Sequence, residues 1–100
     1  MRVAIIGQFR IPLERLERAR PEMRKVLEAS RAEAGCRAYD FGEDVLDPGL
    51  IRVSEIWDSA EQLMAHTQTP HYLAWAEMRD ELGLSGRKVT LLHVSAEQEV

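Results

Sequence analysis

The residues that could carry chemistry lie in the middle of the chain, and His66 is the first of them. A free imidazole has a pKa of about 6.5, so at neutral pH this side chain can accept a proton and later return it. We therefore predict that His66 is a general base or a hydrogen-bonding partner of a substrate. The alternative is structural, because a histidine near the end of a short helix can bond the last helix carbonyls.

Aromatic side chains in nearby segments could surround a small molecule. Trp57 shares one face of a predicted strand with Val53 and could form a flat wall for an aromatic substrate. Tyr39 could donate a hydrogen bond to a substrate oxygen. Tyr72 and Trp75 are one helical turn apart, so they share a face of a helix. We predict these five residues as substrate-binding, with packing in the core or at a sheet edge as the alternative for the aromatic ones.

Glu55, the remaining histidines and Cys36 are weaker candidates for a functional role. Glu55 alternates with apolar neighbours, so it should point inward, where a carboxylate must be paired or hydrogen-bonded. We expect a structural ion pair, within the chain or across a dimer, with a catalytic carboxylate as the alternative. His71 is expected at a pocket rim or on the surface, and His93 as a polar break in the last strand. Cys36, without a histidine or cation beside it, should only pack.

The sequence carries no motif for a cofactor or a metal. The segment Ile6-Gly7-Gln8 after the first apolar run lacks the glycines of a dinucleotide loop, and no Cys/His spacing suits zinc. The chain has 13 Lys and Arg against 17 Asp and Glu, a net charge of -4, which disfavours nucleic acid as a partner. A single cysteine and the absence of a long apolar run predict a cytoplasmic protein without a membrane partner.

The strands that would position these residues follow from β-branched and alternating patterns. We predict strands over residues 2–9, 37–43, 50–57 and 87–94. Asp-Pro-Gly at 47–49 should reverse the chain between the second and third strands. The second strand would carry Tyr39, and the third would carry Glu55 and Trp57.

Helical periodicity predicts the elements between the strands. A long amphipathic helix should run from Leu13 to Gly35, with a kink or a break at Pro21. Ser59 begins a capping box for a short helix that ends near residue 68. Thr69-Pro70 should begin a further helix, because a capping hydroxyl and a proline at the first helical position are typical of helix starts.

The order strand, helix, strand, strand, helix, strand predicts a ferredoxin-like α+β fold with a four-stranded antiparallel sheet. A length of 100 residues permits one domain, with a core over about 2–94 and a polar tail over 95–100. Several strands carry aliphatic residues on both faces, and helices cover only one of them. We therefore predict that a second copy covers the other face in a barrel-like homodimer.

With this order established, part of the chain resembles the antibiotic biosynthesis monooxygenase (ABM) family. The resemblance is carried by Ser-Arg-Ala-Glu-Ala-Gly-Cys at 30–36 leading into Tyr39, and by Glu-Ile-Trp at 55–57, Ala-His at 65–66 and Pro-His at 70–71. It implies a dimeric α/β barrel and a cofactor-independent oxidation of a phenol, quinol or anthrone by O2. His66 matches the helix histidine of the family. The ligand histidine of the haem-degrading branch is replaced by Ala76, which disfavours haem.

The implied chemistry needs a substrate that is easily oxidised, one base and a dry aromatic pocket. Two other functions remain open: a non-catalytic dimeric module that binds a small ligand or is associated with stress, and an isomerase of a small lactone or keto compound. A closed apolar cavity of roughly 300 Å³ or more beside His66 would favour the enzyme. A filled core would favour the module.

Overall fold

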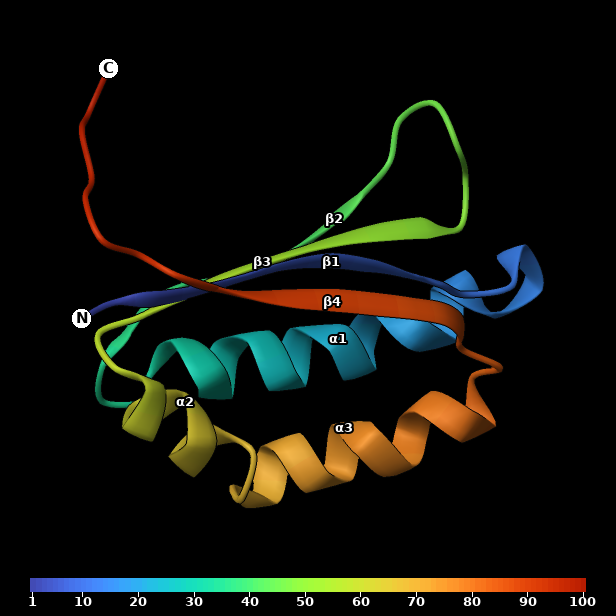
Figure 1. Ribbon diagram of the computed structural model, residues 1–100. Helices are drawn as coiled ribbons and strands as arrows, with labels where there is room; N and C mark the ends of the chain where they lie inside the picture. The colour runs from blue at the N-terminus through green and yellow to red at the C-terminus, as the bar shows by residue number, and fades with distance from the viewer.

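A computed structural model describes residues 1–100 as one sheet with helices on a single face (Figure 1). The elements are β1 (Val3–Arg10), the 3-10 helix η1 (Leu13–Arg15), α1 (Leu16–Arg31), β2 (Cys36–Glu43), β3 (Leu50–Trp57), α2 (Ala60–His66), α3 (Pro70–Glu81) and β4 (Ser85–His93). The sheet is antiparallel, with strand order β2-β3-β1-β4. The predicted ferredoxin-like α+β fold is confirmed.

Strand register decides which residues face the helices. Glu55 of β3 lies opposite both Ile5 of β1 and Tyr39 of β2, and Ile5 lies opposite Leu91 of β4. These four residues form one row across the sheet. Because side chains alternate along a strand, the whole row points to the same face. Tyr39 and Glu55 are buried under the helices, whereas Leu91 is exposed.

Helix α1 differs from the prediction at Pro21. A 3-10 turn precedes the helix, but α1 itself runs unbroken through this proline, so of the two predicted outcomes, a kink or a break, the break is wrong. Pro21 lies in the second turn and is exposed. The carbonyl that loses its bond, that of Glu17, therefore lies near an exposed helix start, where water can satisfy it. Gly35 (φ +82°) follows the helix in the left-handed region, in the expected manner.

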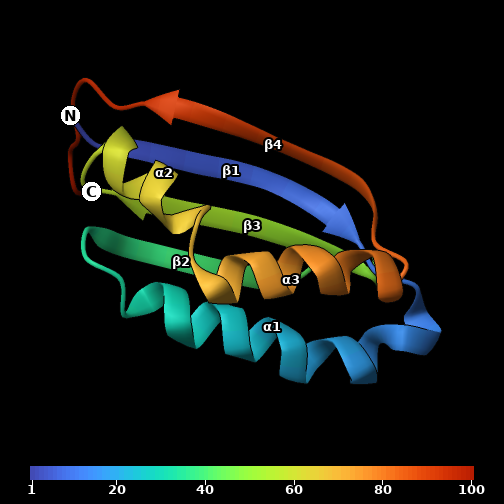
Figure 2. The same ribbon diagram turned by 90° about the horizontal axis from the view of Figure 1, so that it is seen from below.

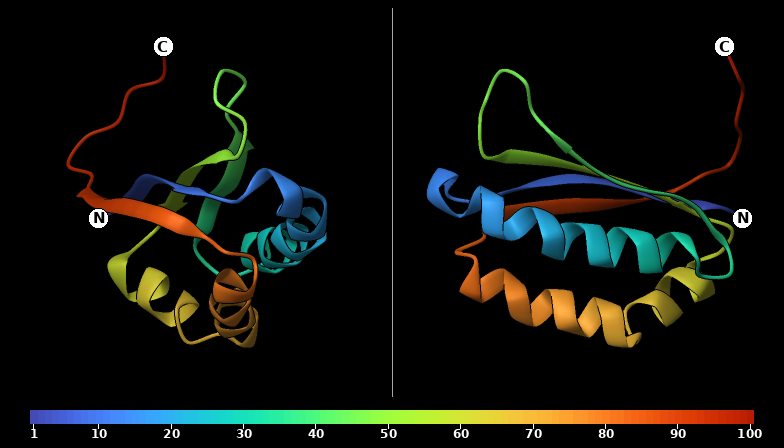
Figure 3. Two further views of the ribbon diagram at one scale, coloured as in Figure 1. Left: turned by 90° about the vertical axis from the view of Figure 1, so that its right-hand side faces the viewer. Right: turned by 180° about the vertical axis from the view of Figure 1, so that it is seen from behind.

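The starts of α2 and α3 agree with the capping signals. The hydroxyl oxygen of Ser59 accepts a hydrogen bond from the Gln62 amide at 3.2 Å, and that of Thr69 accepts one from the Tyr72 amide at 3.3 Å. Both helices lie on the same side of the sheet as α1 (Figure 3). The short link between them places His66 at the end of α2.

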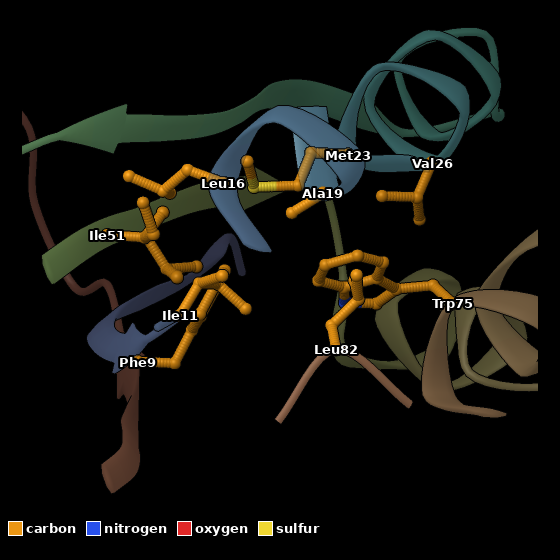
Figure 4. Close-up of a cluster of buried hydrophobic side chains, with 10 residues drawn as sticks. Phe9, Ile11, Leu16, Ala19, Met23, Val26, Ile51, Trp75 and Leu82 are labelled. Carbon is orange, nitrogen blue, oxygen red and sulfur yellow. The ribbon is translucent and has the colours of Figure 1, made fainter. Parts of the chain in front are cut away.

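The core consists of two clusters of buried side chains. The larger one lies between the sheet, α1 and α3, and Figure 4 shows the indole of Trp75 reaching into it from α3. Its members are Phe9, Ile11, Leu16, Ala19, Met23, Val26, Ile51, Val53, Trp75 and Leu82. The smaller cluster contains Val3, Tyr39, Trp57 and Leu63. Ile5 and Phe41 pack against both clusters and link them.

Helices leave two parts of the sheet uncovered. Strand β4 lies at an edge beyond the helices (Figure 2). On the face opposite the helices, Ile6 is 51% and Leu92 is 41% exposed. The apolar outer face predicted from the sequence is therefore present. None of the helices combines the length and the apolar character that a membrane crossing requires.

Candidate functional site

A cavity of about 160 Å³ lies between the inner face of the sheet and helices α2 and α3. Fifteen residues line it, and ten of them are hydrophobic. Five of the six residues predicted for the site are in its wall: Tyr39, Val53, His66, Tyr72 and Trp75. The volume is smaller than the roughly 300 Å³ that we expected of a closed substrate pocket. The core is nevertheless not filled at this place.

Trp57 is the sixth predicted residue, and it does not line the cavity. Its side chain is completely buried in the smaller core cluster, with its ring centroid 4.9 Å from that of His66. Its indole N–H donates to Glu55 Oε1 at 3.0 Å. The expectation that Trp57 forms a substrate wall is therefore corrected. It packs against one polar residue of the site and bonds a second one.

His66 is buried to 1% exposure and is held at one ring nitrogen only. Its Nδ1 lies 2.5 Å from Glu33 Oε2, while Nε2 is buried without a hydrogen-bond partner. An ionised carboxylate only accepts hydrogen bonds, so in a neutral imidazole the proton lies on Nδ1 and the lone pair on Nε2. The structural alternative required the imidazole to bond a helix carbonyl, and it bonds none. His66 can therefore accept a proton at Nε2.

Glu33 is the site residue that the sequence did not reveal as a partner of His66. It lies in the turn after α1, and its Oε2 also meets His71 Nε2 at 2.8 Å. The two histidines lie on either side of the junction between α2 and α3, five residues apart. That pair was a usable signal for a shared partner, but nothing in the sequence indicated that residue 33 would reach it. His71 is partly exposed and is not among the residues that line the cavity, so of the two expected positions, rim or surface, it has the second.

Glu33, His66 and His71 also form a set of potential metal ligands, with ligand atoms within 4.8 Å of one another. Zinc bonds nitrogen and oxygen at about 2.0–2.2 Å, which in a tetrahedral site places neighbouring ligand atoms about 3.3–3.6 Å apart. The two distances to Glu33 Oε2, 2.5 and 2.8 Å, are shorter and fall in the hydrogen-bond range. The geometry favours a carboxylate hydrogen-bonded to two imidazoles.

Glu55 presents a second titratable group to the cavity. It is 9% exposed and lines the wall, yet no cation lies within 4.0 Å of it in this chain. The expected ion pair is therefore not formed within the chain. Burial raises the pKa of the Glu55 carboxyl, and the hydrogen bond from Trp57 and the charge of Arg87 oppose that rise. Glu55 can exchange a proton with a molecule in the cavity.

Two tyrosines enclose the imidazole of His66. The ring centroids of Tyr39 and Tyr72 lie 5.1 and 5.0 Å from that of His66, both edge to face. Burial and then the nearby charge of Glu55 raise the pKa of the Tyr39 phenol. Tyr39 therefore stays protonated and can act as a hydrogen-bond donor but not as a base; its hydrogen bond to a substrate stays a prediction.

Other residues of the wall were not singled out in the sequence, namely Ile5, Phe9, Phe41, Leu63, Met64, Thr67, Arg79, Arg87 and Val89. Phe41 could have been found, because it alternates with Tyr39 on the same face of β2. Arg79 could also have been found, since it lies one helical turn beyond Trp75. Arg87 depends on the pairing of β4 with β1, which the sequence does not display.

The two remaining candidates, Cys36 and His93, do not line the cavity. Cys36 is half-buried, and burial raises the pKa of its thiol, which agrees with a packing role. His93 is exposed on β4 and does not line the cavity.

Comparison with known proteins gives consistent results. The model of the antibiotic biosynthesis monooxygenase family matches residues 2–78. Rv0793 of Mycobacterium tuberculosis, whose name assigns it provisionally to the monooxygenases, is 36% identical over 94 residues, which cover 90% of this chain and 88% of that protein. Its solved structure has a TM-score of 0.87 at 31% identity and covers 99% of this chain and 100% of that one.

Two further proteins are similar to this chain at lower identity. A Deinococcus radiodurans structure described as a candidate antibiotic biosynthesis monooxygenase has a TM-score of 0.91 at 22% identity, with 98% of this chain and 97% of that one covered. A Synechocystis protein without an assigned function is 23% identical over 96 residues, which cover 96% of this chain; this chain spans 65% of that protein's length. The match over residues 2–78 and the Mycobacterium relative together show that this chain belongs to the antibiotic biosynthesis monooxygenase family.

Proposed function

We propose that the protein is a monooxygenase that oxidises a small phenolic or quinol-like compound with O2 and without a cofactor. The observation that carries the proposal is the state of His66. Its Nδ1 is bound by Glu33, its Nε2 is unpartnered, and its ring lies in the wall of a mainly apolar cavity. Membership of the family supports oxygenase chemistry at the general level.

The reaction begins with a proton transfer. His66 Nε2 takes the proton of a phenolic hydroxyl, and the resulting phenolate can give electrons to O2. One oxygen atom forms a new C–O bond, the O–O bond breaks, and the other atom leaves as water. A hydroquinone and O2 thus give a hydroxyquinone and H2O, with all four electrons supplied by the substrate. The mainly apolar wall keeps bulk water from the reactive intermediates.

Each neighbouring residue has a role in this proposal. Glu33 holds the proton on Nδ1 of His66, and Tyr39 donates a hydrogen bond to a substrate oxygen. Val53, Tyr72 and Trp75 contact the substrate ring through the cavity wall. Trp57 acts indirectly, through its hydrogen bond to Glu55.

We also propose that the protein is a homodimer closed through the outer face of the sheet. Exposed apolar residues on that face, Ile6 and Leu92, are its strongest support. The loop between β2 and β3 extends to the same side of the sheet (Figure 3), and its Val45 and Leu46 are almost fully exposed. A second copy would cover both sets of side chains.

A second candidate function is non-catalytic binding of a small ligand in the same cavity. The modest volume of about 160 Å³ favours this alternative, because a ligand of that size could fill the space and leave little room for O2 beside it. A third candidate, isomerisation of a small keto compound, is favoured by two proton-exchanging groups, His66 and Glu55, in one cavity.

Oxygen uptake by the purified protein tests the proposal. A panel of hydroquinones and anthrones should include a donor that accelerates uptake above the buffer rate, with no loss after treatment with a chelator. His66→Ala should lower that uptake by about 100-fold or more, the scale expected when a general base is removed. His93→Ala is the matched control and should leave uptake unchanged. If the wild-type protein consumes no oxygen with any donor, the monooxygenase proposal is wrong.

A further inference from the structure

The size of the cavity suits a substrate with one ring. An engineered protein cavity of about 150 Å³ lined by aliphatic and aromatic residues holds benzene. The cavity beside His66 has a volume of about 160 Å³ and ten hydrophobic residues in its wall. It therefore accommodates a single six-membered ring, whereas the three fused rings of an anthrone require more space.

Two guanidinium groups lie in the wall of this cavity. Arg79 comes from α3 and Arg87 from β4, at the edge that Figure 2 shows beyond the helices. Arg87 is exposed and Arg79 is partly exposed, so both belong to the rim rather than to the interior. The Arg79 guanidinium lies 5.8 Å from the ring centroid of Tyr72, close to where a substrate ring would bind.

Neither arginine has a carboxylate within 4.0 Å, although most basic residues of the chain have one. The basic residues that form ion pairs with Asp or Glu are Arg2, Arg10, Arg18, Arg20, Lys25, Arg31, Arg37 and Arg52. Arg79 and Arg87 thus bring two positive charges without a direct ion-pair partner to the mouth of a mainly apolar cavity, and the charge of Arg87 acts on Glu55 only at longer range. Guanidinium groups bind carboxylates strongly and with directional preference.

The interior of the cavity, unlike its mouth, disfavours an anionic group. Glu55 lies there, buried and with no cation within 4.0 Å, so an anionic group at the inner end would lose its hydration without gaining an ion pair. His66 Nε2 instead favours a neutral hydroxyl that can donate a proton. The two ends of the cavity therefore select different groups on one molecule.

We propose that the substrate is a single-ring phenol or hydroquinone that carries a carboxylate, with its hydroxyl at His66 and its carboxylate between Arg79 and Arg87. The inference rests on the proposed function for the reaction, but the binding mode can be measured without turnover. A carboxylate on the side of the ring away from the reacting hydroxyl places each group at the end of the cavity that binds it.

Isothermal titration with two unreactive probes tests the inference. 4-Hydroxybenzoate and 4-hydroxybenzamide have the same shape and hydroxyl, and only the first is charged. Wild-type protein should bind the benzoate at least about tenfold more tightly. Arg79→Gln and Arg87→Gln should each remove most of that preference. Lys88→Gln, next to Arg87 but on the opposite face of β4, should retain it.

Equal affinity of the wild-type protein for the two probes, or no binding of either, would overturn the inference. So would a preference that survives in both arginine variants. Charge-selective binding without oxygen uptake from any hydroquinone would instead retain the inference and reject the monooxygenase. Oxygen uptake that is equally fast with charged and neutral hydroquinones would reject the inference alone.

Discussion

A buried imidazole can act as a base only if one of its nitrogens has no proton, and in His66 the position of Glu33 decides which nitrogen that is. The carboxylate accepts from Nδ1, and Tyr39 and Tyr72 hold the ring edge to face. His71 bonds the same carboxylate oxygen and limits its movement. At the residue scale, the site therefore depends on a side chain that does not need to touch the substrate.

Replacing Glu33 by glutamine tests this dependence. The amide can donate a hydrogen bond to Nδ1, which would move the imidazole proton to Nε2 and remove the base. We expect kcat to fall by about 10- to 100-fold, as when other groups that orient a functional histidine are replaced, with a smaller change in KM. Nitrogen NMR of the imidazole should show the proton on Nε2. Glu61→Gln, on the exposed surface of α2, is the control and should change neither kcat nor the tautomer. An unaltered tautomer in Glu33→Gln would contradict this role.

Glu55 should make stability depend on pH. Burial raises its pKa in the folded protein, so above an unfolded-state value of about 4.3 the folded protein binds more protons than the unfolded chain. The free energy of unfolding therefore loses a contribution as pH rises through the folded-state pKa. Glu55→Gln cannot ionise, and its stability relative to wild type should increase from pH 4 to pH 8 by about 1 kcal/mol, a typical size for one substitution.

Urea unfolding of both proteins at pH 4, 6 and 8 measures that difference. Glu77→Gln, an exposed substitution in the interior of α3, is the control and should show a smaller change across this pH range. A difference between Glu55→Gln and wild type that stays constant across the three pH values would mean that Glu55 is not penalised by burial.

At the scale of elements, local signals predicted the structure where a backbone group needed a local partner. Ser59 and Thr69 cap α2 and α3 as expected, and the glycine after α1 has the positive φ that ends a helix. Pro21 was misjudged, because the cost of a proline depends on where the helix begins. The 3-10 turn moves the start of α1 to Leu16, so Pro21 falls in its second turn.

Pro21→Ala should stabilise α1. The substitution restores one backbone donor at an exposed position and removes the contact of the ring with the preceding turn. We expect the free energy of unfolding to rise by about 1–2 kcal/mol, less than for a proline in mid-helix. Urea denaturation measures it, with exposed Arg24→Ala of the same helix as the control. Lower stability of Pro21→Ala would show that the proline favours folding by restricting the unfolded chain.

At the scale of the whole molecule, aliphatic residues on both faces of the strands predicted an apolar outer face, and Ile6 and Leu92 are exposed there. The sequence could not show which residues meet across the helices. Glu33 and His66 are 33 positions apart, and their contact depends on how α1 and α2 lie on the sheet. For the same reason, Trp57 was placed on the correct face of β3, but its position behind the cavity wall could not be predicted.

The dimer proposal makes a quantitative prediction. Sedimentation of the wild-type protein at micromolar concentration should show a species of twice 11.4 kDa. Ile6→Lys places a charge on the outer face and should produce a monomer. Leu73→Lys is the matched control, because Leu73 and Ile6 are both 51% exposed but Leu73 lies on α3. A stable wild-type monomer, or a dimer that withstands Ile6→Lys, would contradict closure through this face.

A structure of the protein with hydroquinone bound under anaerobic conditions tests the central claim most directly. We predict that one phenolic oxygen lies about 2.6–3.2 Å from His66 Nε2, with the ring against Tyr72 and Trp75. Hydroquinone bound elsewhere, or a cavity that remains empty while Nε2 bonds a protein atom, would contradict the assignment of His66 as the base.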